Sequence, residues 1–116
     1  GYRDSPIGIH EREGLMEVPL STVCLGSFRL PCSGGAYVRF YPFRFFRYLA
    51  EKVACNRPYI FYIHPWELDE TPPRVTLQWS KSIRHYYNTK GTAEKVKRLL
   101  KEMDFTSIQN IIGHGN

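Results

Sequence analysis

A run of five apolar residues at 59–63, closed by a histidine and a proline, constrains the fold of this chain more than any other feature. The run reads Tyr-Ile-Phe-Tyr-Ile and is followed by His64 and Pro65. Successive side chains of an extended chain point to opposite faces, so the run predicts a strand covered on both faces, as in parallel α/β layers. Pro65 has no N–H to donate to a neighbouring strand, so we expect the strand to end before it.

Two segments have the apolar spacing of amphipathic helices. The first helix is predicted over 42–55, where Pro42 suits the first turn and four apolar residues share one face: Phe46, Leu49, Ala50 and Val53. The second is predicted to start at Thr92, a suitable N-cap, and its apolar stripe has five members: Ala93, Val96, Leu99, Leu100 and Met103. The basic residues between 95 and 101 are interpreted as a solvated face opposite this stripe.

Short β-segments surround these helices. Strands are predicted over 15–18, 22–25, 28–30 and 105–112, with 1–13 as a loop or frayed end and 36–40 as strand or loop. Gly34 and Gly35 are expected in a turn, with either pre-proline or positive-φ geometry. With 116 residues, the chain is a single domain or a fragment of one. The order of elements predicts an α/β fold with a mixed, partly parallel sheet and two flanking helices.

Composition and charge exclude several classes of protein. The net charge of +5 suits an anionic polymer, but no groove-reading motif supports nucleic acid as a partner. The chain has no signal peptide and no run of about 18 apolar residues, so we expect no membrane span and a cytoplasmic location. Three cysteines, an odd number, indicate free thiols rather than a disulfide framework. The four histidines are scattered, which predicts no self-contained metal site.

His64 is the residue at which the sequence most strongly indicates chemistry. Ligands of α/β sheets bind just beyond the carboxyl ends of strands, and an imidazole exchanges protons near neutral pH. Glu67 or Asp69 can orient the ring, and Trp66 is a candidate for stacking on a sugar. The alternative interpretation is a histidine that is satisfied by a backbone carbonyl at a strand end.

Four short motifs occur in a fixed order along nearly the whole chain, at 15–22, 34–42, 62–69 and 84–94. The third contains the string His-Pro-Trp-Glu, from His64 to Glu67, followed by Asp69. The second runs from two glycines through Arg39 to a proline. Together they resemble the C-terminal region of NodB-type polysaccharide deacetylases, the group of carbohydrate esterase family 4.

The resemblance implies both a fold and an activity. It implies the C-terminal part of a distorted (β/α) barrel, in a bacterial hydrolase that removes N-acetyl groups from polysaccharide. The implied partners are that polysaccharide and the remainder of the barrel. By motif, His64 matches the general acid that protonates the amine leaving group. The residues implied to line the substrate groove are Glu17, Arg39, Trp66, Glu67 and Asp69.

The early motifs of that family, an Asp-rich strand and an H-x-x-x-H metal pair, are absent from this sequence. We therefore expect no cofactor in this chain and a divalent metal in the full-length enzyme, and we expect the chain alone to be inactive. The alternative function is a non-catalytic carbohydrate-binding or assembly module. An apolar face left by the missing part of the barrel predicts self-association.

Overall fold

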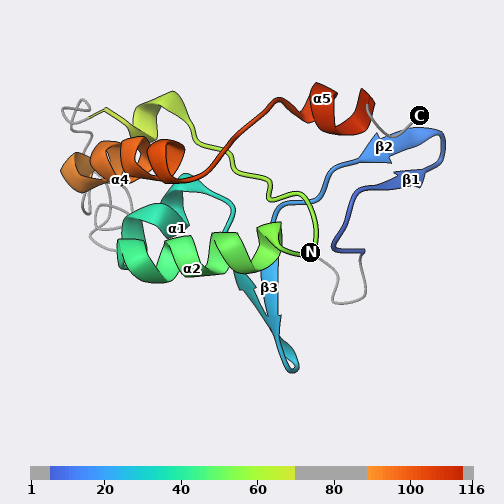
Figure 1. The fold of residues 1–116 in the computed structure, drawn as a ribbon, viewed down its shortest axis with the longest axis horizontal. Coiled ribbons are helices and arrows are strands. Elements are labelled where there is room, and N and C mark those ends of the chain that lie inside the picture. The colour runs from blue at the N-terminus through green and yellow to red at the C-terminus, as the bar shows by residue number, and fades with distance from the viewer. Residues whose placement is uncertain (1–5, 70–88, 114–116) are drawn as a thin grey trace, which may run out of the picture.

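The computed structural model describes residues 6–69 and 89–113, in which two β-hairpins lead into a group of helices (Figure 1). The strands are β1 (His10–Arg12), β2 (Leu15–Glu17), β3 (Thr22–Leu25) and β4 (Phe28–Pro31). The helices are α1 (Gly35–Phe40), α2 (Phe43–Ala54), the 3-10 helix η1 (Pro65–Glu67), α4 (Thr89–Glu102) and α5 (Ile108–Gly113). The fold is mixed α/β, as predicted, but both sheets of the described residues are two-stranded and antiparallel.

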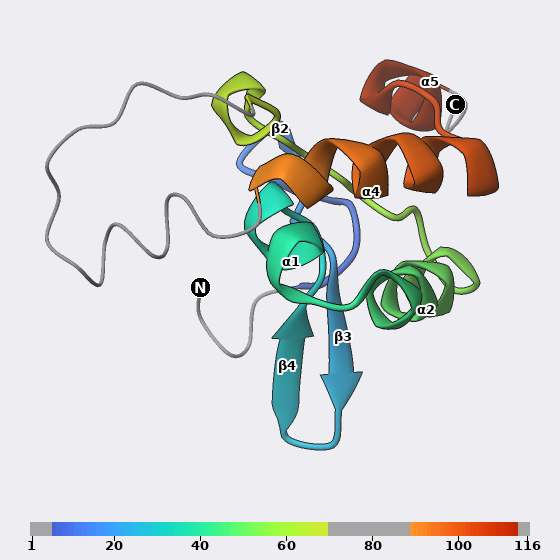
Figure 2. The ribbon, with the colours of Figure 1, turned by 90° about the vertical axis from the view of Figure 1, so that its left-hand side faces the viewer.

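Each hairpin turns where the backbone has positive φ. Glu13 and Gly14 connect β1 to β2 with φ of 53° and 78°, the combination that a two-residue hairpin turn requires. This pairing makes residues 10–12 a strand where a loop was predicted. Gly26, with φ of 59°, lies in the turn between β3 and β4. The antiparallel pairing of these two strands confirms the strands predicted over 22–25 and 28–30. Figure 2 shows that the β3–β4 hairpin projects away from the helices.

Helix α2 confirms the helix predicted over 42–55, and its apolar face joins two groups of buried side chains. Leu49 and Val53 pack with Val23 and Cys32 beside the β3–β4 hairpin. Phe46 packs with three residues of α1 and α4: Val38, Val96 and Leu99. Helix α1 consequently lies against both α2 and α4, as Figure 2 shows.

Helix α4 begins at Thr89, three residues earlier than predicted. Thr92 is a fully buried residue inside the helix rather than its N-cap, while Leu100 of the predicted apolar stripe is exposed. All three cysteines are free thiols, as predicted. No helix in the described ranges is long and apolar enough to cross a membrane.

Residues 59–63 do not form a strand, which corrects the central β prediction. Their ladder contact within the described chain is an isolated parallel bridge between Gly34 and Tyr62. Phe61 and Ile63 are covered by helices instead of by neighbouring strands, because both pack against the core that α1, α2 and α4 share, whereas Tyr62 is exposed. The described residues therefore contain no parallel sheet.

Helices replace one segment that was predicted as strand or loop and one that was predicted as a strand. Residues 36–40 lie in α1, and α5 takes the place of the last strand. Ser107 explains the second case, because its Oγ accepts a hydrogen bond from the N–H of Asn110 (3.2 Å), an N-cap contact. The isoleucines at 108, 111 and 112 also have helical spacing. Residues 75–88, which include the first five residues of the fourth motif, lie outside the described residues.

Candidate functional site

The extended segment 59–64 is held in place by its alternate backbone amides. These amides donate to three different kinds of acceptor: Ile60 to Ser21 Oγ (2.7 Å), Tyr62 to the Ser33 carbonyl (3.0 Å) and His64 to Glu67 Oε2 (2.9 Å). The Tyr59 hydroxyl adds a hydrogen bond to the Cys32 carbonyl (2.6 Å). The segment thus has the alternating anchorage of a strand, although none of these four partners is a strand residue.

His64 is exposed at the end of this segment, between two aromatic rings. The Tyr62 ring meets the imidazole edge-on, with centroids 5.5 Å apart. The Trp66 ring stacks on it at 5.7 Å with an interplanar angle of 9°. Tyr62 and Trp66 are 39% and 47% exposed, so both present ring surface to solvent. We call these three residues the aromatic triad.

Helix η1 fixes the backbone of His64. The N–H of Glu67 donates to the His64 carbonyl (2.9 Å), and the Glu67 carboxylate accepts from the His64 N–H. Pro65 suits the first turn because it has no N–H to leave unsatisfied. Two hydrogen bonds in opposite directions therefore join residues 64 and 67.

The Glu67 carboxylate that holds His64 is itself buried against Arg39. The two residues are 3% and 2% exposed, and Arg39 Nη2 lies 4.0 Å from Glu67 Oε1. A buried charge is tolerated in a protein interior when an opposite charge compensates it. Arg39 belongs to α1, so the pair also ties α1 to η1.

Gly34 and Gly35 make room for this arrangement. A Cβ on Gly35 would lie 2.3 Å from Glu67 Oε2, and one on Gly34 would lie 2.8 Å from the Tyr62 hydroxyl. Gly34 has φ of −113°, and neither glycine has positive φ, so the prediction of positive φ is wrong. The glycines are required by close approach instead.

Lys95 closes the other end of α1. Its Nζ donates to the carbonyls of Val38 (3.1 Å), Arg39 (3.2 Å) and Tyr41 (2.9 Å), which uses all three ammonium hydrogens. Burial lowers the pKa of Lys95. Lys95 is therefore not part of the solvated face predicted for 95–101. Instead it caps the C-terminus of α1, as cations near helix C-termini do.

The structure brings five of the six predicted site residues together and separates the sixth. His64, Trp66, Glu67 and Asp69 lie in or next to η1, and Arg39 contacts Glu67. Glu17 lies in β2, where it pairs with two residues of β1: His10 (3.1 Å) and Arg12 (3.8 Å). Figure 1 shows this hairpin at the opposite end of the molecule's long axis from η1.

Sequence reasoning missed Tyr62, Gly35 and Lys95 as parts of the site. Tyr62 had a signal, because it is two residues before His64 and Trp66 is two after, the period of an extended face. Within the described ranges, no group of three His, Cys, Asp or Glu side chains could hold a metal ion. The described residues therefore do not fit a metal centre, and no chemical step is assigned to one.

Comparison with known proteins gives one match. A family model described as a domain of unknown function, DUF3473, matches residues 1–113. No curated protein and no solved structure matches the chain.

Proposed function

This chain belongs to the DUF3473 family of domains of unknown function, and we propose that it is the C-terminal portion of a bacterial polysaccharide deacetylase. In this proposal His64 is the general acid in the hydrolysis of N-acetyl groups on sugars. The observation that carries it is the exposed imidazole of His64, fixed at its backbone by Glu67 and placed between two half-exposed rings. The four ordered sequence motifs support the same reading.

The proposal assigns one proton transfer to this chain, from the ring of His64 to the leaving amine. Water adds to the amide carbonyl, and the C–N bond then breaks to release acetate and an amine. The protonated imidazole donates its proton to the nitrogen as that bond breaks. The stacked ring of Trp66 holds the imidazole in its orientation. The base that accepts the proton of water is not assigned to a described residue.

Arg39 and Glu67 are positioning residues in this proposal. Both side chains are buried, so they act on the substrate through His64 and not by direct contact. Tyr62 and Trp66 offer the flat apolar surfaces on which a sugar ring stacks. Glu17 lies on the distant hairpin and is left out of the groove, and the barrel implied by the resemblance is assigned to residues beyond this chain.

Acetate release from an N-acetylated oligosaccharide by the full-length protein tests the proposal. His64→Ala should lower kcat by about 10²–10⁴-fold, the usual contribution of a general acid, with little change in KM. His10→Ala on β1 is the matched control, and it should leave both constants unchanged. Unaltered turnover in His64→Ala, with the fold retained by circular dichroism, would end the assignment.

A sugar-binding module without catalysis is the second candidate, favoured by the exposed ring surfaces of Tyr62 and Trp66. It predicts that Trp66→Ala weakens binding of the oligosaccharide while His64→Ala changes no rate. Calorimetric titration of both variants, together with the rate of acetate release in His64→Ala, distinguishes the two functions. Binding that is unaffected by Trp66→Ala would contradict this candidate as well.

A further inference from the structure

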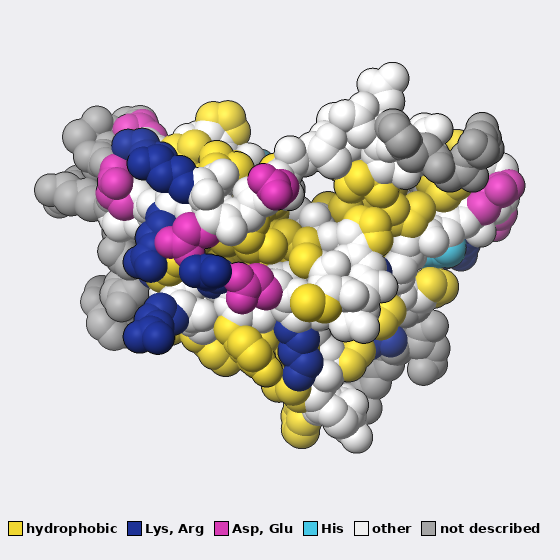
Figure 3. Space-filling view, in the orientation of Figure 1, with side chains coloured by type: hydrophobic (Ala, Val, Ile, Leu, Met, Phe, Trp, Pro, Cys, Tyr) yellow, Lys and Arg dark blue, Asp and Glu magenta, His cyan; other side chains and the backbone are white. Residues whose placement is uncertain are grey.

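A second site is formed by α2 and α4, away from η1. A cavity of about 380 Å³ lies there and is lined by six residues: Phe43, Arg44, Arg47, Tyr48, Glu51 and Arg98. Its volume falls within the range of small-molecule sites, roughly 300–1,000 Å³. Figure 3 shows that Lys and Arg side chains gather on this face, with acidic side chains among them. None of the lining residues belongs to the aromatic triad.

A network of ion pairs holds two of the arginines at the cavity. Arg47 Nε donates to Glu51 Oε1 (2.8 Å), and the same guanidinium contacts Glu102. Arg98 Nε donates to Glu102 Oε1 (2.6 Å), and its guanidinium lies 4.3 Å from the centroid of the Phe43 ring. Each carboxylate of the network is therefore compensated by an arginine, and both guanidinium planes are preorganised.

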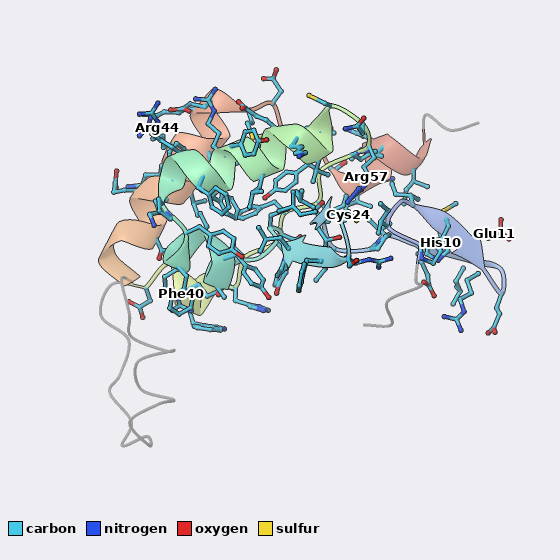
Figure 4. All side chains as sticks on the ribbon, turned by 90° about the horizontal axis from the view of Figure 1, so that it is seen from below. His10, Glu11, Cys24, Phe40, Arg44 and Arg57 are labelled. Carbon is cyan, nitrogen blue, oxygen red and sulfur yellow. The ribbon has the colours of Figure 1, made fainter. Side chains whose placement is uncertain are left out.

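Two further cations on α2 exceed this balance: Arg44 lines the cavity, and Lys52 lies outside its lining but near Tyr48. Arg44 is exposed at the outer end of α2 (Figure 4), and no acidic side chain in the described ranges lies within 4.0 Å of its guanidinium. Lys52 Nζ lies 5.9 Å from the ring centroid of Tyr48. Arg44, Tyr48 and Lys52 are spaced by four residues and so share one face of the helix. An exposed ring thus lies between two positive charges.

We propose that this cavity binds a sugar residue that bears a carboxylate. The guanidinium of Arg44 pairs with the carboxylate, since its fork of N–H donors matches two carboxylate oxygens. The exposed ring of Tyr48 stacks on the sugar, a contact that a small inorganic anion cannot use. The choice of a sugar rests on the proposed function, whereas the choice of an anion rests on the charges of the cavity. The substrate would accordingly be an acidic polysaccharide.

Isothermal titration of the full-length protein tests the inference with three probes: an oligosaccharide of glucuronic acid, a neutral oligosaccharide of equal length, and inorganic phosphate. The acidic oligosaccharide should bind at least tenfold more tightly than the neutral one. Arg44→Ala should weaken that binding by about tenfold, the effect of one lost charge-assisted contact. Tyr48→Ala should weaken it several-fold, and both side chains are exposed, so the fold should persist.

Two matched variants separate a specific site from general attraction to a basic protein. Arg12→Ala removes the same charge from the distant β1–β2 hairpin and should leave the affinity unchanged. Glu51→Gln keeps an acceptor for Arg47 but removes a negative charge from the cavity wall, so it should strengthen binding. Equal affinity for the acidic and neutral oligosaccharides, or equal weakening by Arg12→Ala, would overturn the proposal.

Two further results test the assignment of the ligand and of the site. Binding of phosphate without binding of the acidic oligosaccharide would refute the sugar assignment. Turnover in His64→Ala reports on the general acid, whereas affinity in Arg44→Ala reports on this cavity, which His64 does not line. A failure of His64 as the general acid is therefore distinguishable from a failure of the anion site.

Discussion

Gly35→Ala is the substitution whose effect the structure defines most closely. The added Cβ would lie 2.3 Å from Oε2 and 2.6 Å from Cδ of Glu67. The carboxylate is buried beside Arg39, so it cannot yield without leaving its counter-ion. Overpacking costs about 1–3 kcal/mol, and separating a buried ion pair costs about 3–5 kcal/mol. The better helix propensity of alanine offsets at most about 1 kcal/mol.

We therefore expect Gly35→Ala to lower the free energy of unfolding by at least about 3 kcal/mol, a large share of the roughly 5–15 kcal/mol typical of a domain. The melting temperature should fall by about 10 °C. Urea titration and thermal denaturation followed by circular dichroism measure both quantities. Gly8→Ala is the control, because a Cβ there meets no atom within 4 Å, and it should change stability by less than about 0.5 kcal/mol.

A double-mutant cycle isolates the clash from other effects of the methyl group. In a Glu67→Ala background the carboxylate is gone, so Gly35→Ala should cost almost nothing there. Glu67→Ala itself should be destabilising by about 3–5 kcal/mol, since it leaves the Arg39 charge buried without this partner. If Gly35→Ala lowers stability equally in both backgrounds, or in neither, the close approach of Glu67 is not the reason for the glycine.

Two further predictions concern buried polar groups. Lys95→Met should lower the free energy of unfolding by about 1–3 kcal/mol, because three carbonyls at the end of α1 lose their donor. Lys97→Met, which breaks an exposed pair with Glu94 on the same helix, should change it by less than about 0.5 kcal/mol in the same urea titration. Burial raises the pKa of Cys32 from 9.0 to about 11, so the folded protein retains a proton that the unfolded chain releases. Stability should thus be complete below pH 9 and fall by about 3 kcal/mol in all as pH rises through 11, and Cys32→Ala should flatten this dependence in unfolding titrations under reducing conditions.

The elements that the sequence predicted well are those whose signal is local. Helix α2 follows from the spacing of Phe46, Leu49 and Val53, and the β3–β4 hairpin follows from Gly26 between two apolar runs. The apolar run at 59–63 was assigned to a parallel sheet because an unbroken apolar run has the same sequence pattern whether strands or helices cover it. Its actual neighbours come from α1, α2 and α4, which are distant in sequence.

The residues of the candidate site also differ in whether a local sequence pattern could predict them. His64, Trp66 and Glu67 are close in sequence, and their common motif made them predictable as a group. The pairing of Glu67 with Arg39 joins residues 28 positions apart, and no local pattern encodes it. Arg39 and Glu67 were expected to touch substrate, but the structure buries both. The sequence therefore indicated that the two residues belong to the site, but it did not predict their burial.

The mixed set of acceptors along residues 60–64 has a consequence for how this region can change during evolution. In an ordinary sheet the acceptors belong to the main chain, and no substitution removes them. Here the N–H of Ile60 relies on the hydroxyl of Ser21 and that of His64 on the carboxylate of Glu67. The position of His64 therefore depends on the side chains of Ser21 and Glu67. A substitution at either residue can displace His64 although residue 64 itself is unchanged.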